Sequence, residues 1–145
     1  MNFRPKDDNY VEKVRDSFGK QQFMDFIGAR LYEVHPGYCE IHLDFKPELS
    51  QQGGFFHGGI IGTLADNAGG YAAHTLMPSD YEVLTVEYKL NIIAPGKGEK
   101  LIACGHVVKS GKTLTICRTD VFVLDKGHKK LCATSLMTLF AIPNS

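Results

Sequence analysis

The sequence has no excess of charge of either sign and no long apolar segment. Its 145 residues carry 16 lysines and arginines against 16 aspartates and glutamates, a formal net charge of zero. A chain without net charge lacks the global field of a nucleic-acid-binding protein. No segment approaches the roughly 20 consecutive apolar residues of a membrane-spanning helix, and the first ten residues, MNFRPKDDNY, lack the apolar core of a signal peptide. We therefore expect a cytoplasmic protein that binds neither nucleic acid nor membrane.

Motifs of metal, hydrolytic and redox chemistry are also missing. The histidines are dispersed and form no HExxH motif, so we expect no metal site. No GxSxG motif occurs, which excludes the nucleophile elbow of the α/β-hydrolases. The cysteines are Cys39, Cys104, Cys117 and Cys132. They form no CxxC pair and lie in apolar runs, which favours reduced, buried thiols over a disulfide or a metal role.

The chain is long enough for one domain with a single core. We expect that domain to cover residues 1–145, with flexible tails at 1–8 and 143–145. Apolar residues at helical spacing predict short helices at 9–18 and 21–27, the second ending at Gly28. Alternating apolar and polar residues predict strands within 29–45, 82–93, 100–109, 113–124 and 129–142, with a turn at Pro36-Gly37 inside the first of these ranges.

One segment between the strands is rich in glycine and alanine. It begins FFHGGIIGTLADNAGG at 55–70, and we expect a helix from His57 to about Met77, ended by Pro78. Each glycine in a helix interior costs about 1 kcal/mol relative to alanine, but small side chains keep the helix thin enough for close packing. The order of elements indicates an α+β domain, in which an antiparallel sheet of about six strands curls around this one long helix.

A single carboxylate, Asp66, lies on the small-residue face of the predicted helix. Helical spacing places it with Gly59 and Gly70, so another backbone, a second subunit or a ligand can approach it. For an isolated helical aspartate, the simpler interpretation is a hydrogen bond to a neighbouring loop. The helix start at His57-Gly58-Gly59 favours a chemical role, because unpaired N–H groups and the positive end of the helix dipole stabilise a developing oxyanion there.

Asp66 and Gly59 are seven residues apart, which is about 10 Å along a helix axis. That separation is too long for both groups of one chain to act on the same carbonyl. If the two groups cooperate, they act across a two-fold axis between antiparallel helices. The hypothesis that follows is a homodimer with shared active sites.

At these residues the chain resembles the hotdog-fold acyl-CoA thioesterases, in particular their PaaI-like branch. The resemblance rests on HGGIIGTLADNA at 57–68, on the strand LTVEYKLNIIAP at 84–95 and on the hairpin KSGKTL at 109–114. The order of the predicted helices and strands also agrees with that family over nearly the whole chain. The resemblance implies a hotdog fold, thioesterase activity, and dimers that assemble into a tetramer.

The resemblance also implies roles for single residues. Asp66 would act as a general base on water or as a nucleophile on the thioester carbonyl. Gly58 and Gly59 would supply oxyanion-hole N–H groups. Thr85 would orient the water or the acid, and His57 would form the turn or the pocket wall. These roles together describe a thioester hydrolase without a metal.

One position departs from the family pattern. Relatives frequently carry asparagine six residues before the histidine, where this chain has Gln51, whose longer carboxamide can still orient water or touch the thioester oxygen. Phe55 and Phe56 adjoin the glycine turn and are candidates to line an acyl pocket, with core packing as the alternative. Lys109 and Lys112 could meet the phosphates of coenzyme A, or lie in a solvated turn.

The leading hypothesis is a cytoplasmic acyl-CoA thioesterase for a small aromatic or medium-chain acyl group. Coenzyme A is then part of the substrate and product, and we expect no separate cofactor. A thiol leaving group has a pKa of about 8.5 and needs little protonation, so one carboxylate and an oxyanion hole suffice. Two alternatives remain. One is a hotdog-fold hydratase or dehydratase of enoyl or 3-hydroxyacyl thioesters, whose HFPG motif is absent here; the other is a non-catalytic acyl-CoA-binding protein.

Overall fold

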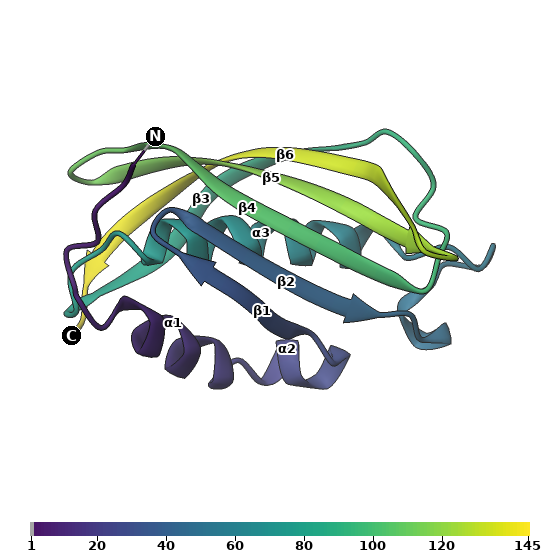
Figure 1. The fold of residues 1–145 in the computed structure, drawn as a ribbon, viewed down its shortest axis with the longest axis horizontal. Helices are drawn as coiled ribbons and strands as arrows, with labels where there is room; N and C mark the ends of the chain where they lie inside the picture. Colours follow the sequence, from purple (N-terminus) through teal and green to yellow (C-terminus); the bar gives the residue numbers. More distant parts are fainter. Residues whose placement is uncertain (1) are drawn as a thin grey trace.

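The computed structural model describes residues 2–145 and follows the predicted order of elements (Figure 1). The α-helices are α1 (Tyr10–Gly19), α2 (Gln22–Ile27) and α3 (Gly58–His74), and a short 3₁₀ helix, η1, covers Pro47–Leu49. The strands are β1 (Arg30–His35), β2 (Tyr38–Asp44), β3 (Tyr81–Ile92), β4 (Lys100–Ser110), β5 (Leu114–Asp125) and β6 (His128–Pro143). The predicted hairpins and the long glycine-rich helix are confirmed.

All six strands form one antiparallel sheet in the order β1-β2-β4-β5-β6-β3. The sheet curves around α3, which packs against β2, β3, β4, β5 and β6 (Figure 1). Alternate residues of β2 face the core, where Cys39, Ile41 and Leu43 have no exposed surface. The four cysteines are free and buried, as predicted. The α+β architecture of a sheet around one long helix is confirmed.

Small residues let the sheet approach α3 closely. A Cβ atom on Gly69 would collide with the sulfur of Met137 in β6. A Cβ atom on Gly105 of β4 would collide with the backbone carbonyl of Ala68 in α3. Because the backbones are this close, larger residues at either position would push the sheet away from the helix. The packing role predicted for the small residues of α3 is confirmed at Gly69.

The helix α3 ends earlier than predicted, at His74 and not at about Met77. The Thr75 hydroxyl donates to the carbonyl oxygen of Ala72 at 2.6 Å and accepts the N–H of Gly37 at 2.8 Å. The N–H groups of Leu76 and Met77 then donate to carbonyl oxygens three residues earlier in the chain, which is the pattern of a 3₁₀-type turn. The side chain of Thr75 thus helps to end the helix before the proline is reached.

The two N-terminal helices lie beside β1 and the outer side of α3 (Figure 1). Val14 of α1 and Met24 and Ile27 of α2 are at most 2% exposed, so both helices belong to the core. Lys13 Nζ donates to the carbonyl oxygen of Met77 at 2.6 Å. This bond ties α1 to the turn that follows α3.

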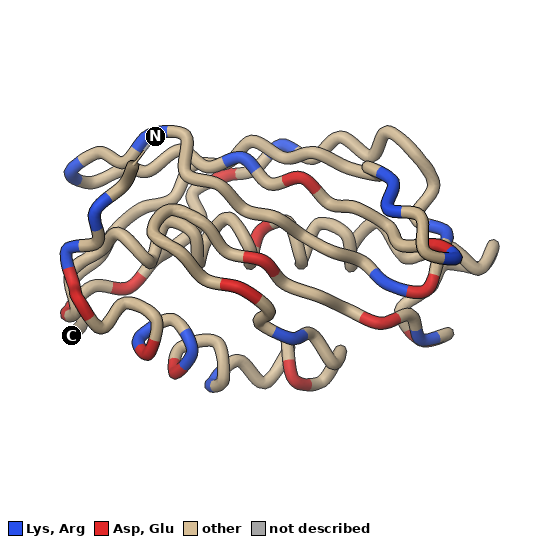
Figure 2. The backbone as a smooth tube through the Cα atoms, viewed as in Figure 1, with Lys and Arg blue, Asp and Glu red and all other residues tan. Residues whose placement is uncertain are grey.

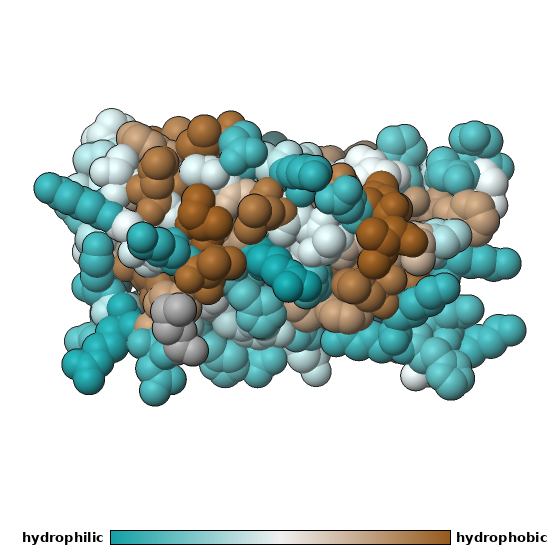
Figure 3. Space-filling model, turned by 90° about the horizontal axis from the view of Figure 1, so that it is seen from above, coloured by the Kyte–Doolittle hydropathy of each residue, from teal (hydrophilic) through white to brown (hydrophobic). Residues whose placement is uncertain are grey.

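Charges of both signs are interspersed over the molecule (Figure 2). Apolar side chains gather in two groups on the face seen in Figure 3, with hydrophilic side chains between them. No helix among residues 2–145 is long and apolar enough to cross a membrane.

The edge strand β3 carries much of the exposed apolar surface. It pairs with β6 on one side, and no strand within residues 2–145 pairs with its other side. Leu84, Val86, Tyr88 and Ile92 of β3 are 44–58% exposed. An unpaired edge that also carries apolar side chains is a surface suited to pairing with another chain.

Candidate active site

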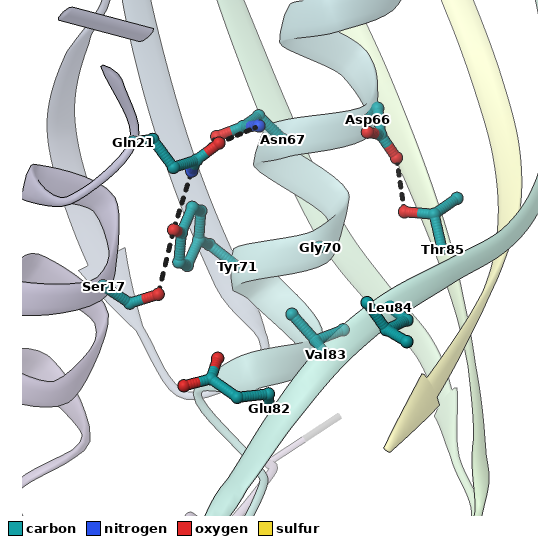
Figure 4. Close-up of a pocket in the computed structure, with 10 residues that line it drawn as sticks. All are labelled: Ser17, Gln21, Asp66, Asn67, Gly70, Tyr71, Glu82, Val83, Leu84 and Thr85. Carbon is teal, nitrogen blue, oxygen red and sulfur yellow. Dashed lines mark hydrogen bonds between the residues drawn. The ribbon is translucent and has the colours of Figure 1, made fainter. Parts of the chain in front are cut away.

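Asp66 lies in the middle of α3 and reaches toward the edge strand β3. Its Oδ1 accepts a hydrogen bond of 2.6 Å from the Thr85 hydroxyl (Figure 4). Both residues line an open cavity of about 250 Å³ beside α3. A hydroxyl that donates to a carboxylate makes a charge-assisted bond, which orients the carboxylate. Oδ2 has no hydrogen-bond partner within residues 2–145, so it is available to accept a proton.

The register of β3 explains why Thr85 faces this carboxylate. Thr85 pairs with Leu139 of β6, a fully buried residue, and paired residues point to the same face of a sheet. The pairing then shifts between Thr85 and Glu87, which is a bulge. A bulge re-aims the side chains beside it and is common next to active sites. The hydroxyl implied by the resemblance is therefore in contact with the acid.

The first turn of α3 holds the predicted backbone donors. His57 is the N-cap residue, and its Nδ1 accepts the N–H of Gly59 at 2.8 Å. Nδ1 is therefore the unprotonated ring nitrogen. The N–H of Gly58 has no acceptor within residues 2–145 and lies at the positive end of the helix dipole. Gly58 is thus the free donor of this turn, and the N–H of Gly59 is occupied by the cap.

Of the predicted site residues, Asp66 and Thr85 line this cavity and the others lie outside it, among them Gln51, Phe55 and Phe56. Gln51 turns back on its own loop, where its side-chain oxygen accepts the N–H of Gly53. Phe55 lines a different open cavity, of about 480 Å³. Phe56 is 2% exposed and packs edge-to-face against Phe45, with ring centroids 5.2 Å apart. Phe56 is therefore a core residue, the alternative that its sequence context allowed.

Lys109 and Lys112 lie at the predicted hairpin between β4 and β5, and both are exposed. Lys112 lines a further cavity, of about 210 Å³, together with Met77 and Pro78. Met77 and Pro78 follow the C-terminal end of α3. Within one chain, the hairpin that carries Lys112 therefore lies at the opposite end of the helix from Gly58.

Glu82 and four uncharged polar residues also line the cavity, and none of them was identified from the sequence. We call Ser17, Gln21, Asn67 and Tyr71 the polar cluster (Figure 4). Gln21 Nε2 donates to Asn67 Oδ1 at 3.0 Å and to the Tyr71 hydroxyl at 2.7 Å. Asn67 Nδ2 donates back to Gln21 Oε1 at 3.2 Å, and the Tyr71 hydroxyl lies 3.1 Å from Ser17 Oγ. A signal was present, because Asn67 and Tyr71 are four residues apart on one helix face.

The Tyr71 phenol of the polar cluster is uncharged at neutral pH, as an ordinary phenol pKa of about 10 already ensures. Burial raises its pKa further, and the hydrogen bonds with Ser17 and Gln21 offset only part of that effect. The phenol keeps its proton and can donate it in a hydrogen bond. The cavity thus joins a carboxylate at Asp66 to a neutral hydrogen-bonding group.

Known proteins share both the sequence and the fold of this chain. Residues 53–129 match the family model described as the thioesterase superfamily. The crystal structure of a thioesterase family protein from Silicibacter pomeroyi is 41% identical, covers 93% of this chain and 99% of its own, and has a TM-score of 0.92. Acyl-coenzyme A thioesterase 13 of Homo sapiens is 32% identical over 106 residues, 71% of this chain and 72% of that protein. The PaaI protein of E. coli is 15% identical, covers 94% of this chain and 96% of its own, and has a TM-score of 0.83, a likeness of fold alone.

Proposed function

Because the chain belongs to the thioesterase superfamily and has the hotdog fold of its relatives, we propose that it hydrolyses acyl-CoA thioesters to a free acid and coenzyme A. The observation that carries this proposal is the Asp66 carboxylate, oriented by Thr85 in an open cavity. The name of the human relative, acyl-coenzyme A thioesterase 13, supports coenzyme A as the thiol. The acyl group is a small aromatic or medium-chain one.

In the base route, Asp66 activates a water molecule. Oδ2 takes a proton from water while the water oxygen bonds to the thioester carbonyl carbon, and the carbonyl oxygen becomes an oxyanion. The oxyanion then re-forms the carbonyl, the carbon–sulfur bond breaks, and the thiolate of coenzyme A leaves. The proton held by Asp66 passes to that thiolate. Thr85 keeps Oδ1 in place throughout, which leaves Oδ2 for the proton.

In the nucleophile route, the carboxylate itself bonds to the carbonyl carbon. The thiolate leaves, and a mixed anhydride between Asp66 and the acyl group forms. Water then cleaves the anhydride to two carboxylates, and of the two protons released one goes to the thiolate and the other to solvent. Both routes pass through an oxyanion on the former carbonyl oxygen. Both therefore need a hydrogen-bond donor aimed at that oxygen.

The free N–H of Gly58 is the proposed oxyanion donor. It is a backbone group at a helix N-terminus, so it is preorganised and needs no rearrangement during the reaction. Loss of one such donor typically raises a barrier by about 3 to 4 kcal/mol. The bond from the N–H of Gly59 to His57 supports Gly58 over Gly59 for this role and gives His57 the task of shaping the turn.

The active site is proposed to be shared between two subunits. Gly58 and Asp66 of one chain are eight residues apart, about 12 Å along α3. A two-fold axis beside β3 would bring Gly58 of the partner subunit toward Asp66. The unpaired edge of β3 and its exposed Val86 and Tyr88 support this strand as the place where two copies meet.

Several finer points belong to the same proposal. We propose one domain over 1–145, membership of the PaaI-like branch, assembly of dimers into a tetramer, a cytoplasmic location and no separate cofactor. Lys109 and Lys112 are proposed to meet the phosphates of coenzyme A, which the exposure of both side chains permits. A lysine ammonium binds phosphate as a point charge on a flexible side chain.

Release of free thiol from a panel of acyl-CoAs tests the proposed function. Asp66→Asn keeps the size of the side chain and removes the charge, and we expect its kcat/KM to fall by about 100-fold or more. Asp25→Asn changes an exposed aspartate on α2 and serves as the matched control. No thiol release from any substrate, or an unimpaired Asp66→Asn, would overturn the proposal. Loss of enoyl absorbance without thiol release would identify a hydratase, and tight binding of an intact thioester would identify a binding protein.

A further inference from the structure

The cavity beside Asp66 has two chemically different ends (Figure 4). One end holds the Asp66 carboxylate with the Thr85 hydroxyl, where the thioester carbonyl reacts in the proposed function. The other end holds the polar cluster, which plays no part in that reaction. A substrate whose carbonyl lies at Asp66 can therefore extend its acyl group toward the polar cluster.

The polar cluster has hydrogen-bond donors to spare. The Tyr71 hydroxyl accepts from Gln21 and shares one further hydrogen bond with Ser17. Whichever of the two hydroxyls donates in that bond, the other keeps an O–H that no group within residues 2–145 accepts. Asn67 Nδ2 has two hydrogens and uses one on Gln21 within residues 2–145. The cluster thus offers one O–H and one N–H to an acceptor on a ligand.

Beside the polar cluster, the cavity is lined by Gly70, which has no side chain. Gly70 is buried, yet a Cβ atom on it would meet no atom within 4 Å. Its neighbour Gly69 differs, because a Cβ atom there would collide with Met137. Packing within the chain therefore requires glycine at 69 but not at 70. The space in front of Gly70 is the cavity that this residue helps to line.

On the basis of the proposed function, we propose that this cavity is the acyl pocket. Its preferred acyl group is short and carries an uncharged hydroxyl or carbonyl oxygen at its far end, which accepts hydrogen bonds from Asn67 and from the Tyr71–Ser17 pair. Gly70 leaves the room that the middle of the acyl group occupies. These residues determine specificity and take no part in the bond-breaking steps.

The size of the cavity and the charge of its lining both restrict which acyl groups bind well. The cavity of about 250 Å³ is smaller than most ligand pockets, which hold roughly 300 to 1,000 Å³, so it encloses only a short acyl group. An apolar chain would also leave the donors of the cluster buried without partners, which costs binding energy. Glu82 lines the same cavity, and its negative charge disfavours an acyl group that ends in a carboxylate.

Matched pairs of substrates test the preference. Each pair consists of two acyl-CoAs that differ by one terminal oxygen, such as hexanoyl-CoA against 6-hydroxyhexanoyl-CoA, and benzoyl-CoA against hydroxybenzoyl-CoA. We expect the oxygen-bearing member of at least one pair to have a kcat/KM about 10-fold higher or more, because a pocket built to donate hydrogen bonds rejects the analogue without the acceptor. The corresponding carboxylate-terminated acyl-CoA should be the poorest substrate.

Gly70→Ala tests whether the space in front of Gly70 holds the acyl group. We expect it to raise stability and to lower activity. Alanine is the better helix former, and its methyl group meets no atom of residues 2–145 within 4 Å, so the Tm should rise. The added methyl group enters the pocket, so kcat/KM for the preferred substrate should fall by about 10-fold or more. Gly19→Ala at the exposed end of α1, where a Cβ atom also meets nothing within 4 Å, is the matched control and should leave kcat/KM unchanged.

Tyr71→Phe tests the hydrogen bonds. It keeps the ring, which packs edge-to-face against Phe18 with centroids 5.8 Å apart, and removes the hydroxyl. The ratio of kcat/KM within the preferred substrate pair should fall toward one, mainly through KM. A role in folding alone would lower the activity on both members of the pair equally and leave the ratio as it is.

The outcomes separate this inference from the proposed function. Thiol release from some acyl-CoA, with no preference for the oxygen-bearing member of any pair, would overturn the inference and leave the proposed function standing. An unchanged activity of Gly70→Ala, or dissociation of its oligomer in sedimentation, would overturn it as well, since the space would then not hold the acyl group. No thiol release from any acyl-CoA would remove the proposed function and the inference with it.

Discussion

At the scale of single residues, the candidate site depends on one hydrogen bond between two elements. Asp66 is on α3 and Thr85 is on β3, nineteen positions later in the chain. An aspartate on an open helix face samples several side-chain orientations, whereas the 2.6 Å bond from Thr85 holds one oxygen and leaves the other free. Catalysis by the proposed base requires this fixed orientation, because proton transfer depends on geometry before it depends on pKa.

Thr85→Val should therefore reduce activity strongly while preserving shape. Valine has nearly the volume of threonine but cannot donate, and a hydrogen bond to a charged group is worth about 1.5 to 3 kcal/mol, so kcat/KM should fall by about 10- to 100-fold. Thr85→Ser keeps the hydroxyl and should retain most of the activity. Steady-state kinetics of both variants make the comparison. Equal losses in the two variants would contradict a role of the hydroxyl.

At the scale of elements, α3 combines packing with chemistry. Its middle is thin, so that β4 and β6 can approach it at Gly105 and Met137. Its first turn is capped by His57, an unusual residue for this position, which leaves the N–H of Gly58 free. Its last turn buries His74, whose Nε2 donates to the carbonyl oxygen of Tyr81 at 3.1 Å.

Removal of the cap should destabilise the protein. His57→Ala leaves the N–H of Gly59 without its acceptor, and the free energy of unfolding should fall by about 1 kcal/mol in urea denaturation. His57→Asn supplies another good capping side chain and should recover most of that loss. If both variants were as stable as the wild type, the bond to Gly59 would not cap the helix in solution.

The burial of His74 should make stability depend on pH. Burial lowers the pKa of this imidazole below its ordinary value of about 6.5, so the folded protein holds it neutral where the unfolded chain binds a proton. Unfolding then takes up a proton, and the free energy of unfolding should decrease as the pH falls below about 6.5. Urea denaturation at a series of pH values measures this slope.

The control for this pH dependence is His74→Gln, which keeps an N–H donor near Tyr81 but does not titrate in this range. Its stability should change less with pH between about 7 and 5 than that of the wild type. The same slope in both proteins would mean that other groups are responsible.

At the scale of the whole molecule, the open edge of β3 and the separation of Gly58 from Asp66 both point beyond one chain. One subunit provides a carboxylate without a nearby oxyanion donor, and a backbone donor without a nearby carboxylate. The proposed two-fold arrangement would supply each from the other subunit. A monomeric form of the protein should accordingly be inactive.

Complementation between two inactive variants tests the shared site. Gly58→Pro removes the N–H at the first helical position, where proline is tolerated, and the extended His57 backbone (ψ 138°) suits a following proline. A mixture of unfolded and refolded Gly58→Pro and Asp66→Asn chains should regain about a quarter of the wild-type activity. Half of the dimers are then mixed, and each mixed dimer has one intact site of two.

The control is Gly58→Ala, which keeps the N–H and places a Cβ atom 3.2 Å from the movable Cδ1 of Ile92. It should stay largely active. If the mixture of the two inactive variants stays inactive while each variant remains dimeric, both groups must act within one chain.

Much of the fold could be predicted from local patterns. The hairpins at 36–37 and 109–114, the glycine-rich helix and the strand periodicity follow from turn chemistry and from the spacing of apolar residues, which neighbouring positions decide. The end of α3 was predicted less well, because Thr75 and Gly37 end it through a bond that joins residues 38 positions apart.

The sequence by itself determined that an antiparallel sheet surrounds one thin helix, that Asp66 stands on its bare face, and that a backbone donor lies at its start. These features depend on residue size, periodicity and the helix dipole, which are local properties. Only the tertiary structure decided which distant side chains meet there. It placed Gln21 against Asn67 and Tyr71, 46 and 50 positions away, and sent Phe56 into the core. The position of the N-terminal helices beside β1 and α3 brings Gln21 to these partners, and such packing depends on the shape of the whole molecule.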